Sequence, residues 1–253
     1  MSDNSNSQQK GAEKDLSAQI AQAIRDAILS GDLVADDRLP SEAELSDTYG
    51  VSRPTVGEAL KRLAAQSLIR TKRGASGGAF VHRLSYPEAY SQLATTATLL
   101  LSLNEVDFAT ACRARFALER GCAPLSAQNR SVDHLAAMRA EITRQSQPGL
   151  SDEAFCASDV AFHRALVDGA SNPVLSWHLA GAVEGMQPLM NMITFRNRDR
   201  AEIVALHIRI TDALEARDAA LIDQFLNALC TVTLRQAEAS EALHAQKNSG
   251  API

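Results

Sequence analysis

The sequence lacks the features of a membrane, secreted or zinc-knuckle protein. No apolar run among its 253 residues reaches the roughly 18 that a membrane span needs. The first residues are polar and contain no apolar signal core, so we expect a cytoplasmic protein without membrane contact. The four cysteines form no CxxC pair, which favours buried, reduced thiols over disulfides.

Aromatic residues are also scarce, at 4% of the chain, whereas alanine and leucine are plentiful. This composition favours helices, and the length favours two domains over one. The net charge of −5 is unevenly distributed. Residues 50–83 carry seven basic side chains against one acidic one, a local charge of +6, while residues 84–253 have a charge of −5. Because phosphate binding is local, the basic segment indicates contact with nucleic acid.

Residues 1–13 are rich in Ser, Asn and Gln, and we expect this tail to be disordered. A helix ending near Gly31 follows, because apolar residues recur there every four positions. These residues are Leu16, Ile20, Ile24 and Ile28.

A helix-turn-helix is predicted next. Ser41 and Glu44 have the spacing of a capping box, so a helix begins at Ser41 and ends before Gly50. Ser52 is a good N-cap for a second helix, and Pro54 falls in its first turn, where proline is tolerated. Strand candidates at 68–72 and 79–82, joined by a glycine-rich loop, complete a winged helix-turn-helix over residues 14–83.

The second helix is the expected recognition helix, whose first turn faces the bases. Arg53 can donate two hydrogen bonds to guanine, and Thr55 can contact a base or phosphate. Lys61 suits a phosphate contact, and Gly74 allows close approach of the wing backbone. The alternative is a solvated basic face. The predicted DNA contacts are Ser41, Ser52, Arg53, Pro54, Thr55, Lys61, Arg73 and Gly74.

Residues 14–83 resemble the N-terminal domain of GntR-type bacterial transcription regulators. The resemblance is carried by residues 28–33, 38–42, 49–56 and 58–60 and by Leu63. Two positions depart from the family, because Ala43 and Gly57 stand where relatives commonly have arginines that contact DNA. The operator preference of the family is therefore not transferred.

The rest of the chain is predicted to be an all-helical domain over residues 88–245, preceded by a linker at 84–87 and followed by a tail at 246–253. The fold class is therefore mainly α. Helices are expected at 88–103, 105–128, 131–146, 151–169, 173–195, 200–216 and 218–245.

This second domain resembles the FCD-type effector domain of the FadR-like branch of the same superfamily. The matching motifs are Arg-x-x-Leu-Glu at 115–119, Asp-x-x-Phe-His at 159–163, Asn172-Pro173 and His-x-x-Ile at 207–210. The resemblance implies a homodimer that binds a small-molecule effector, and repression is the commoner mode among relatives.

Asp159 and His163 are four residues apart and share one helix face, where they can offer an oxygen and a nitrogen to one cation. His207 can complete a site for zinc, nickel or manganese. The resemblance implies a further histidine where this chain has Leu229. One alternative is a metal held by these three ligands plus water or an effector carboxylate. The other is that the pocket has lost its metal and binds its ligand directly. An ordinary hydrogen-bonded Asp–His pair is the alternative.

Arg115 is the candidate cation for a carboxylate effector, since a guanidinium binds carboxylates through two hydrogen bonds. A structural ion pair is its alternative role. Asn172 is taken as a second effector-binding residue from the resemblance. Small organic acids and acyl groups both suit such a pocket.

The leading hypothesis is a sequence-specific transcription regulator, a repressor of operator DNA controlled by a small-molecule effector. A metal-dependent enzyme using Asp159, His163 and His207 is the second hypothesis. No nucleophile motif or phosphate loop accompanies those residues, so we expect no enzyme. A non-specific nucleoid protein is disfavoured by the acidic second domain.

Overall fold

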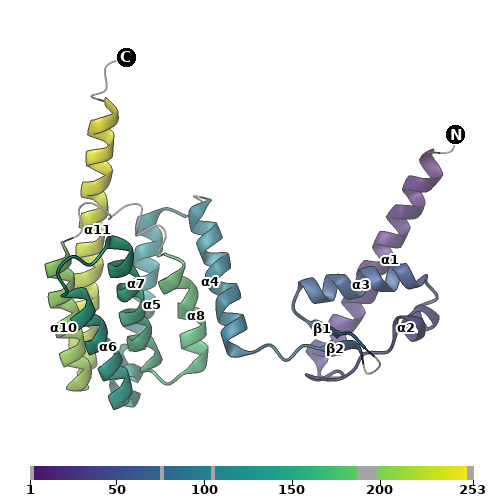
Figure 1. The fold of residues 1–253 in the computed structure, drawn as a ribbon, viewed down its shortest axis with the longest axis horizontal. Coiled ribbons are helices and arrows are strands. Elements are labelled where there is room, and N and C mark those ends of the chain that lie inside the picture. The colour runs from purple at the N-terminus through teal and green to yellow at the C-terminus, as the bar shows by residue number, and fades with distance from the viewer. Residues whose placement is uncertain (1–2, 75–76, 104–105, 187–198, 250–253) are drawn as a thin grey trace. The chain divides into compact units, whose positions relative to one another are not determined.

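The computed structural model describes residues 3–74, 77–103, 106–186 and 199–249. It divides into two compact units, Met1–Ser85 and Tyr86–Ile253, and the boundary lies in the expected linker at 84–87. The fold is mainly α, as predicted, with a single two-stranded sheet in the described residues (Figure 1). Within those residues, no helix is long and apolar enough to cross a membrane.

The first unit is a winged helix-turn-helix, as predicted. Helix α1 (Asp3–Ser30) packs on α3 (Arg53–Ala65), and α3 also packs on the short α2 (Glu42–Tyr49). Strands β1 (Ile69–Lys72) and β2 (Gly78–Val81) pair antiparallel, with Ile69 opposite Val81. One core joins these elements and includes Ile20, Ile24, Leu39, Leu45, Val56, Leu60, Leu63, Ile69 and Val81.

The helix caps form as the sequence predicts. The Ser41 hydroxyl oxygen accepts a hydrogen bond from the Glu44 backbone N–H, and the Glu44 carboxylate accepts one from the Ser41 backbone N–H at 2.7 Å. Gly50 ends α2 with φ 63°, in the left-handed region that favours glycine. Ser52 caps α3 by accepting a hydrogen bond from the Thr55 N–H.

Both ends of the chain differ from expectation. Helix α1 begins at Asp3, so residues 3–13, which we expected to be disordered, are helical. The packed part of α1 supplies the helix nucleus, and each residue added before it gains a backbone hydrogen bond without a new nucleation step. Residues 246–249, expected in the tail, likewise extend the last helix to Ser249.

The second unit is an all-helical bundle. Its helices are α4 (Tyr86–Ser102), α5 (Phe108–Asn129), α6 (Val132–Gln145), α7 (Asp152–Asp168), α8 (Pro173–Glu184), α10 (Arg200–Glu215) and α11 (Ala219–Ser249). The closest pairs are α5 with α11, α4 with α8, α6 with α7, and α10 with α11. The helix expected at 173–195 ends at Glu184 in α8, and residues 187–195 lie outside the described ranges.

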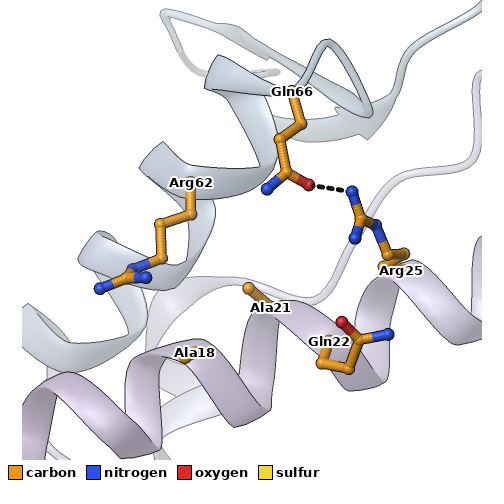
Figure 2. A pocket seen from close by; sticks show the side chains of 6 residues that line it. All are labelled: Ala18, Ala21, Gln22, Arg25, Arg62 and Gln66. Carbon is orange, nitrogen blue, oxygen red and sulfur yellow. Dashed lines mark hydrogen bonds between the residues drawn. The ribbon is translucent and has the colours of Figure 1, made fainter.

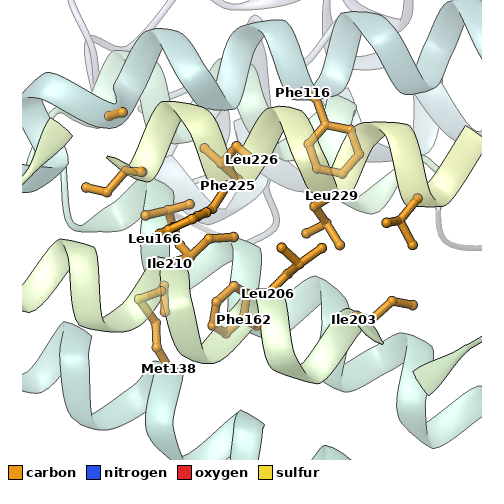
Figure 3. Close-up of a cluster of buried hydrophobic side chains, with 14 of the residues drawn as sticks. Phe116, Met138, Phe162, Leu166, Ile203, Leu206, Ile210, Phe225, Leu226 and Leu229 are labelled. Atoms are coloured by element: carbon orange, nitrogen blue, oxygen red, sulfur yellow. The ribbon is translucent and has the colours of Figure 1, made fainter. Parts of the chain in front are cut away.

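The core of this bundle is aliphatic and aromatic (Figure 3), and it includes Phe116, Met138, Phe162, Leu166, Ile210, Leu226 and Leu229. All four cysteines are free thiols, as expected. Burial raises the pKa of Cys112 to about 12, which keeps that thiol protonated and unreactive.

Candidate functional site

The start of α3 presents the predicted DNA-reading turn. Arg53 and Pro54 are exposed there, and Arg53 makes no ion pair with any residue that the structure describes. An exposed guanidinium at the first turn of a recognition helix is free to meet a base edge. Thr55 differs from expectation, because its side chain is only 6% exposed and its hydroxyl lies 2.8 Å from that of Ser52. Thr55 therefore braces the helix start instead of facing outward.

The other predicted DNA residues lie on the surface. Lys61 is exposed but forms an ion pair with Glu58 at 2.7 Å, a surface contact that contributes little stability. Arg73 and Gly74 are exposed at the end of β1, and Gly74 has φ 104°. Beside them, Gly77 is obligatory, because a Cβ there would lie 2.5 Å from the Lys72 carbonyl oxygen.

Part of the basic segment is neutralised in a way that the sequence did not indicate. Arg70 and Arg83 both pair with Asp36, at 2.5 and 2.8 Å. The hydrogen bond from Arg83 lowers the pKa of Asp36 below its usual value. Arg38 donates a hydrogen bond to the Gly77 carbonyl at 2.9 Å. These arginines support the wing, so fewer side chains are free for phosphate than the local charge suggests.

A groove between α1 and α3 holds two more guanidinium groups (Figure 2). Arg25 on α1 donates a hydrogen bond to the Gln66 side-chain oxygen at 2.7 Å, which ties α1 to the end of α3. Arg62 lines the same groove across from Ala18 and Ala21. The contact helps to hold α3 at a defined angle on α1.

In the second unit, the structure brings the three predicted metal ligands together. Asp159 and His163 come from α7 and His207 from α10, and their candidate ligand atoms all lie within 4.8 Å of one another. The Nε2 atoms of His163 and His207 lie 3.9 and 3.5 Å from Asp159 Oδ1. Both imidazoles are fully buried.

The outer nitrogen of each imidazole has a partner that orients the ring. His207 Nδ1 lies 2.8 Å from Gln145 Oε1, and His163 Nδ1 contacts the Glu119 carboxylate. A proton on each Nδ1 leaves the Nε2 lone pairs facing Asp159, as in metal sites. Both Nε2 atoms are buried and lack a hydrogen-bond partner. These residues therefore fit a divalent cation.

Neither Glu119 nor Gln145 is among the predicted site residues. Glu119 is the last residue of the Arg-x-x-Leu-Glu motif at 115–119, so this motif could have identified it as a candidate site residue. Gln145 is 62 residues from His207, and nothing in the sequence connects the two.

The charges at the site are balanced by close pairs. Arg115 Nε donates to Glu119 at 2.7 Å, and Arg115 Nη2 lies 3.5 Å from Asp159 Oδ2. Burial raises the pKa of Glu119, but its interactions with His163 and Arg115, including their hydrogen bonds, outweigh this effect and lower the pKa overall. Burial lowers the pKa of His207 to about 3, so this imidazole is neutral at pH 7, the form that binds metals.

Helix α11 closes the site with a residue that cannot ligate. Leu229 is 2% exposed and lines a small cavity beside Asp159 and His163. The cavity measures about 10 Å³, near the space that a single water molecule occupies. A cation held by the three ligands therefore keeps at least one coordination position free of protein.

Of the two predicted effector residues, only Arg115 lies at the cavity. Arg115 lines the cavity, and its Nη2 is buried without a hydrogen-bond partner. Asn172 does not line it. Its side chain caps α8 and accepts hydrogen bonds from the N–H groups of Val174 and Leu175 at 3.0 and 3.3 Å. An asparagine before a proline at a helix start is explained by capping alone.

Comparison with known proteins agrees with both units. The model described as "Bacterial regulatory proteins, gntR family" matches residues 16–81, and the FCD domain model matches residues 110–231. The uncharacterized HTH-type transcriptional regulator YcbG of Bacillus subtilis (strain 168) is 30% identical over 205 residues, which cover 81% of this chain and 82% of YcbG.

A second relative is the HTH-type transcriptional repressor NanR of Cronobacter sakazakii, 30% identical over 226 residues, or 85% of this chain and 82% of NanR. The solved structure of Streptococcus agalactiae GntR has a TM-score of 0.55 at 19% identity, covering 87% of this chain and 99% of that one, which shows a shared fold. The enzyme hypothesis finds no support among these proteins, because the family and its members are transcriptional regulators. The chain belongs to the GntR family of bacterial regulatory proteins and carries an FCD domain after its DNA-binding domain.

Proposed function

We propose that this protein is a homodimeric repressor whose operator binding is controlled by a small carboxylate effector held in the FCD domain. The observation that supports the effector half is the pair of buried imidazole Nε2 atoms that make no hydrogen bond. They face Asp159 beside Arg115 Nη2, which also makes no hydrogen bond. Buried polar atoms without partners are rare in native structures, and they indicate a site that a ligand completes.

The DNA half rests on the start of α3. Arg53 reads a base edge, while Ser52 and Pro54 set the helix start that aims it. Ser41, Lys61, Arg73 and the backbone at Gly74 contact phosphates or the groove. Two such helices in a dimer address the two halves of a pseudo-palindromic operator. Since operator DNA is its partner, the protein acts in the cytoplasm.

In the effector domain, Asp159, His163 and His207 hold a divalent transition metal such as zinc, nickel or manganese. When bound, the metal supplies a Lewis-acidic cation that attracts an effector carboxylate. Glu119 and Gln145 orient the imidazoles, and Arg115 adds a second positive group beside the open side of the site. An effector then changes operator affinity only as far as it binds the DNA-competent state differently from the alternative state.

The test of the DNA half is operator discrimination. Wild-type protein should bind a fragment of its own promoter more tightly than random DNA of equal length. Arg53→Ala should remove the difference, because the base contact is lost while the fold is kept. Arg73→Ala is the matched control, and it should weaken binding to both DNAs alike. Unchanged discrimination by the Arg53 variant would refute the role of this residue.

The test of the effector half is metal content. Elemental analysis of protein purified without chelator or histidine tag should find about one equivalent of a transition metal per chain. The Asp159→Asn variant should hold much less. Wild-type protein that takes up less than about a tenth of an equivalent after soaking in zinc, nickel and manganese would contradict the metal site.

A further inference from the structure

Three residues of α11 face the small cavity beside the triad. Leu229, Thr233 and Gln236 are spaced by four and three positions, so they lie on one face of the helix. Leu229 stands where the resemblance implies an imidazole. This helix therefore offers hydrocarbon at its first cavity position and a primary amide two turns later.

The amide of Gln236 has no partner. The residue is 5% exposed, and its Nε2 is buried without any hydrogen bond. Arg115 lines the same cavity. Its Nη2 is also buried without a hydrogen bond, because its ion-pair contact with Asp159 Oδ2 is 3.5 Å long, while Arg115 Nε is held by Glu119 at 2.7 Å. Two residues that line the cavity, one from α5 and one from α11, thus each carry a buried donor nitrogen that makes no hydrogen bond.

Two donors that make no hydrogen bond suit a group with two acceptor atoms, and a carboxylate offers two adjacent oxygens that only accept hydrogen bonds. The neighbouring wall is hydrocarbon, made of Phe116, Ile203 and Leu229. In Figure 3, Leu229 lies below Phe116 and above Ile203. The Thr233 hydroxyl already donates to the Leu229 carbonyl at 2.9 Å. The carbon next to the carboxylate therefore meets hydrocarbon, and a hydroxyl on that carbon would give up water for an apolar wall.

We propose that Gln236 is a specificity-determining residue that, with Arg115, binds the carboxylate of a short aliphatic monocarboxylate. The inference rests on the proposed function, since it concerns the same effector site. The cavity has room for about one water molecule, so a ligand enters only as far as the Leu229 side chain moves aside, and this favours a short chain. The chain displaces the Leu229 side chain and so transmits binding to α11.

The test is calorimetric titration of the zinc-loaded, full-length protein with acetate, propionate and butyrate, and with lactate as the hydroxylated comparison. Propionate should bind, and lactate should bind more weakly because its hydroxyl exchanges water for the hydrocarbon wall. Gln236→Leu should weaken propionate binding by roughly tenfold to a hundredfold, since one hydrogen bond to a charged group is lost. Gln236→Glu should abolish it by charge repulsion. Gln128→Leu, at an exposed position on α5, is the matched control and should bind as wild type does.

A measurement on the wild-type protein tests the proposal even if the variants do not fold. Propionate should shift one glutamine side-chain amide pair in a nitrogen-15 correlation spectrum. The proposal is overturned if no such amide shifts at saturation, if a folded Gln236→Leu variant binds propionate unchanged, or if lactate binds as tightly as propionate. Wild-type protein that binds its operator yet none of these carboxylates also overturns it and leaves the regulator intact. Loss of operator selectivity in the wild type would instead refute the proposed function.

Discussion

At the residue scale, the effector site is a buried cluster of charged and neutral polar groups. Arg115, Glu119, His163 and His207 are at most 2% exposed, within a bundle whose core is mainly hydrocarbon. Such groups are tolerated only when they are paired, and each has at least one partner in the cluster. Phe162 stacks on His207 with ring centroids 3.9 Å apart, which restricts the imidazole further. The cluster is therefore preorganised before a ligand binds.

The first prediction concerns Glu119, the partner of His163 Nδ1. Glu119→Gln should lower the affinity for zinc by about tenfold to a hundredfold, because a neutral amide orients and polarises the imidazole less well than a carboxylate. Competition with a chromophoric chelator measures this affinity. Glu153→Gln, at an exposed position on the same helix as His163, is the control. Equal zinc affinities for the two variants would show that Glu119 plays no such role.

The second prediction concerns pH and the metal-free protein. The pKa of His207 is 6.5 in the unfolded chain and about 3 in the folded one. The unfolded chain takes up a proton as pH falls below 6.5, while the folded chain does not, so stability decreases from pH 6.5 towards pH 3. The pKa of Glu119 is lowered from 4.5, so its contribution is complete above that pH. Between pH 6.5 and pH 4.5, the change in stability with pH therefore reports on His207.

The measurement is the urea midpoint of chelator-treated protein at about pH 7 and about pH 5. Wild type should lose more stability across this interval than His207→Gln, which has no proton to gain at that position. A variant that retains the full wild-type slope would disprove the assignment to His207.

At the element scale, two glycines in the second unit differ in the space around them: one is crowded and the other is open. Gly185, at the end of α8, lies against α4, and a Cβ there would be 2.7 Å from Ala97 Cβ. Gly121 is inside α5, and a Cβ there would meet nothing within 4 Å. Sequence alone presents both as helix-weakening residues. Only the structure distinguishes them, because a Cβ at Gly185 would meet both Ala97 of α4 and the Gly181 carbonyl oxygen.

The third prediction compares alanine at these two positions. Gly185→Ala should destabilise the protein by about 1–3 kcal/mol, because the methyl group overpacks the α4–α8 contact. Gly121→Ala should stabilise it by about 0.5–1 kcal/mol, because alanine is the better helix former and has space. Urea denaturation of both variants checks the signs. Similar effects for the pair would mean that the close contact is relaxed in solution.

At the scale of the whole molecule, each unit has a hydrophobic core of its own. The first unit is held by the contact of α1 with α3 and by the wing packed on the end of α3. A unit with a complete core is expected to fold independently. The second unit supplies the effector site and, under the proposed function, the contacts between protomers.

The fourth prediction follows from this division. A fragment of residues 1–85 should unfold cooperatively in urea, but it should bind the operator about a hundredfold or more weaker than the full chain, because it engages one half-site at a time. Circular dichroism and fluorescence anisotropy provide the two readouts. A fragment that binds as tightly as the intact protein would argue against a dimer as the DNA-binding form.

The sequence predicted the features that depend on local rules. The capping box at Ser41, the turn at Gly50 and the N-cap at Ser52 follow from neighbouring residues, and the structure contains each of them. It misjudged Thr55, because the burial of that side chain depends on how α3 packs. It also assigned Asn172 to the effector, although the cap of α8 explains that residue fully.

The amino-acid sequence by itself determined the winged helix-turn-helix and the all-helical second domain, since motif spacing and helix periodicity are local properties. The pair Asp159 and His163 follows from the same spacing rule, whereas His207 joined the three candidate ligands through the resemblance to the FCD domain. Tertiary structure decided which partners orient those ligands and which donors remain unpaired. Gln145 reaches His207 and Gln236 reaches the cavity only because α6, α10, α5 and α11 pack around one core. Contacts between residues so distant in the chain depend on the packing angles of whole helices, which no local pattern encodes.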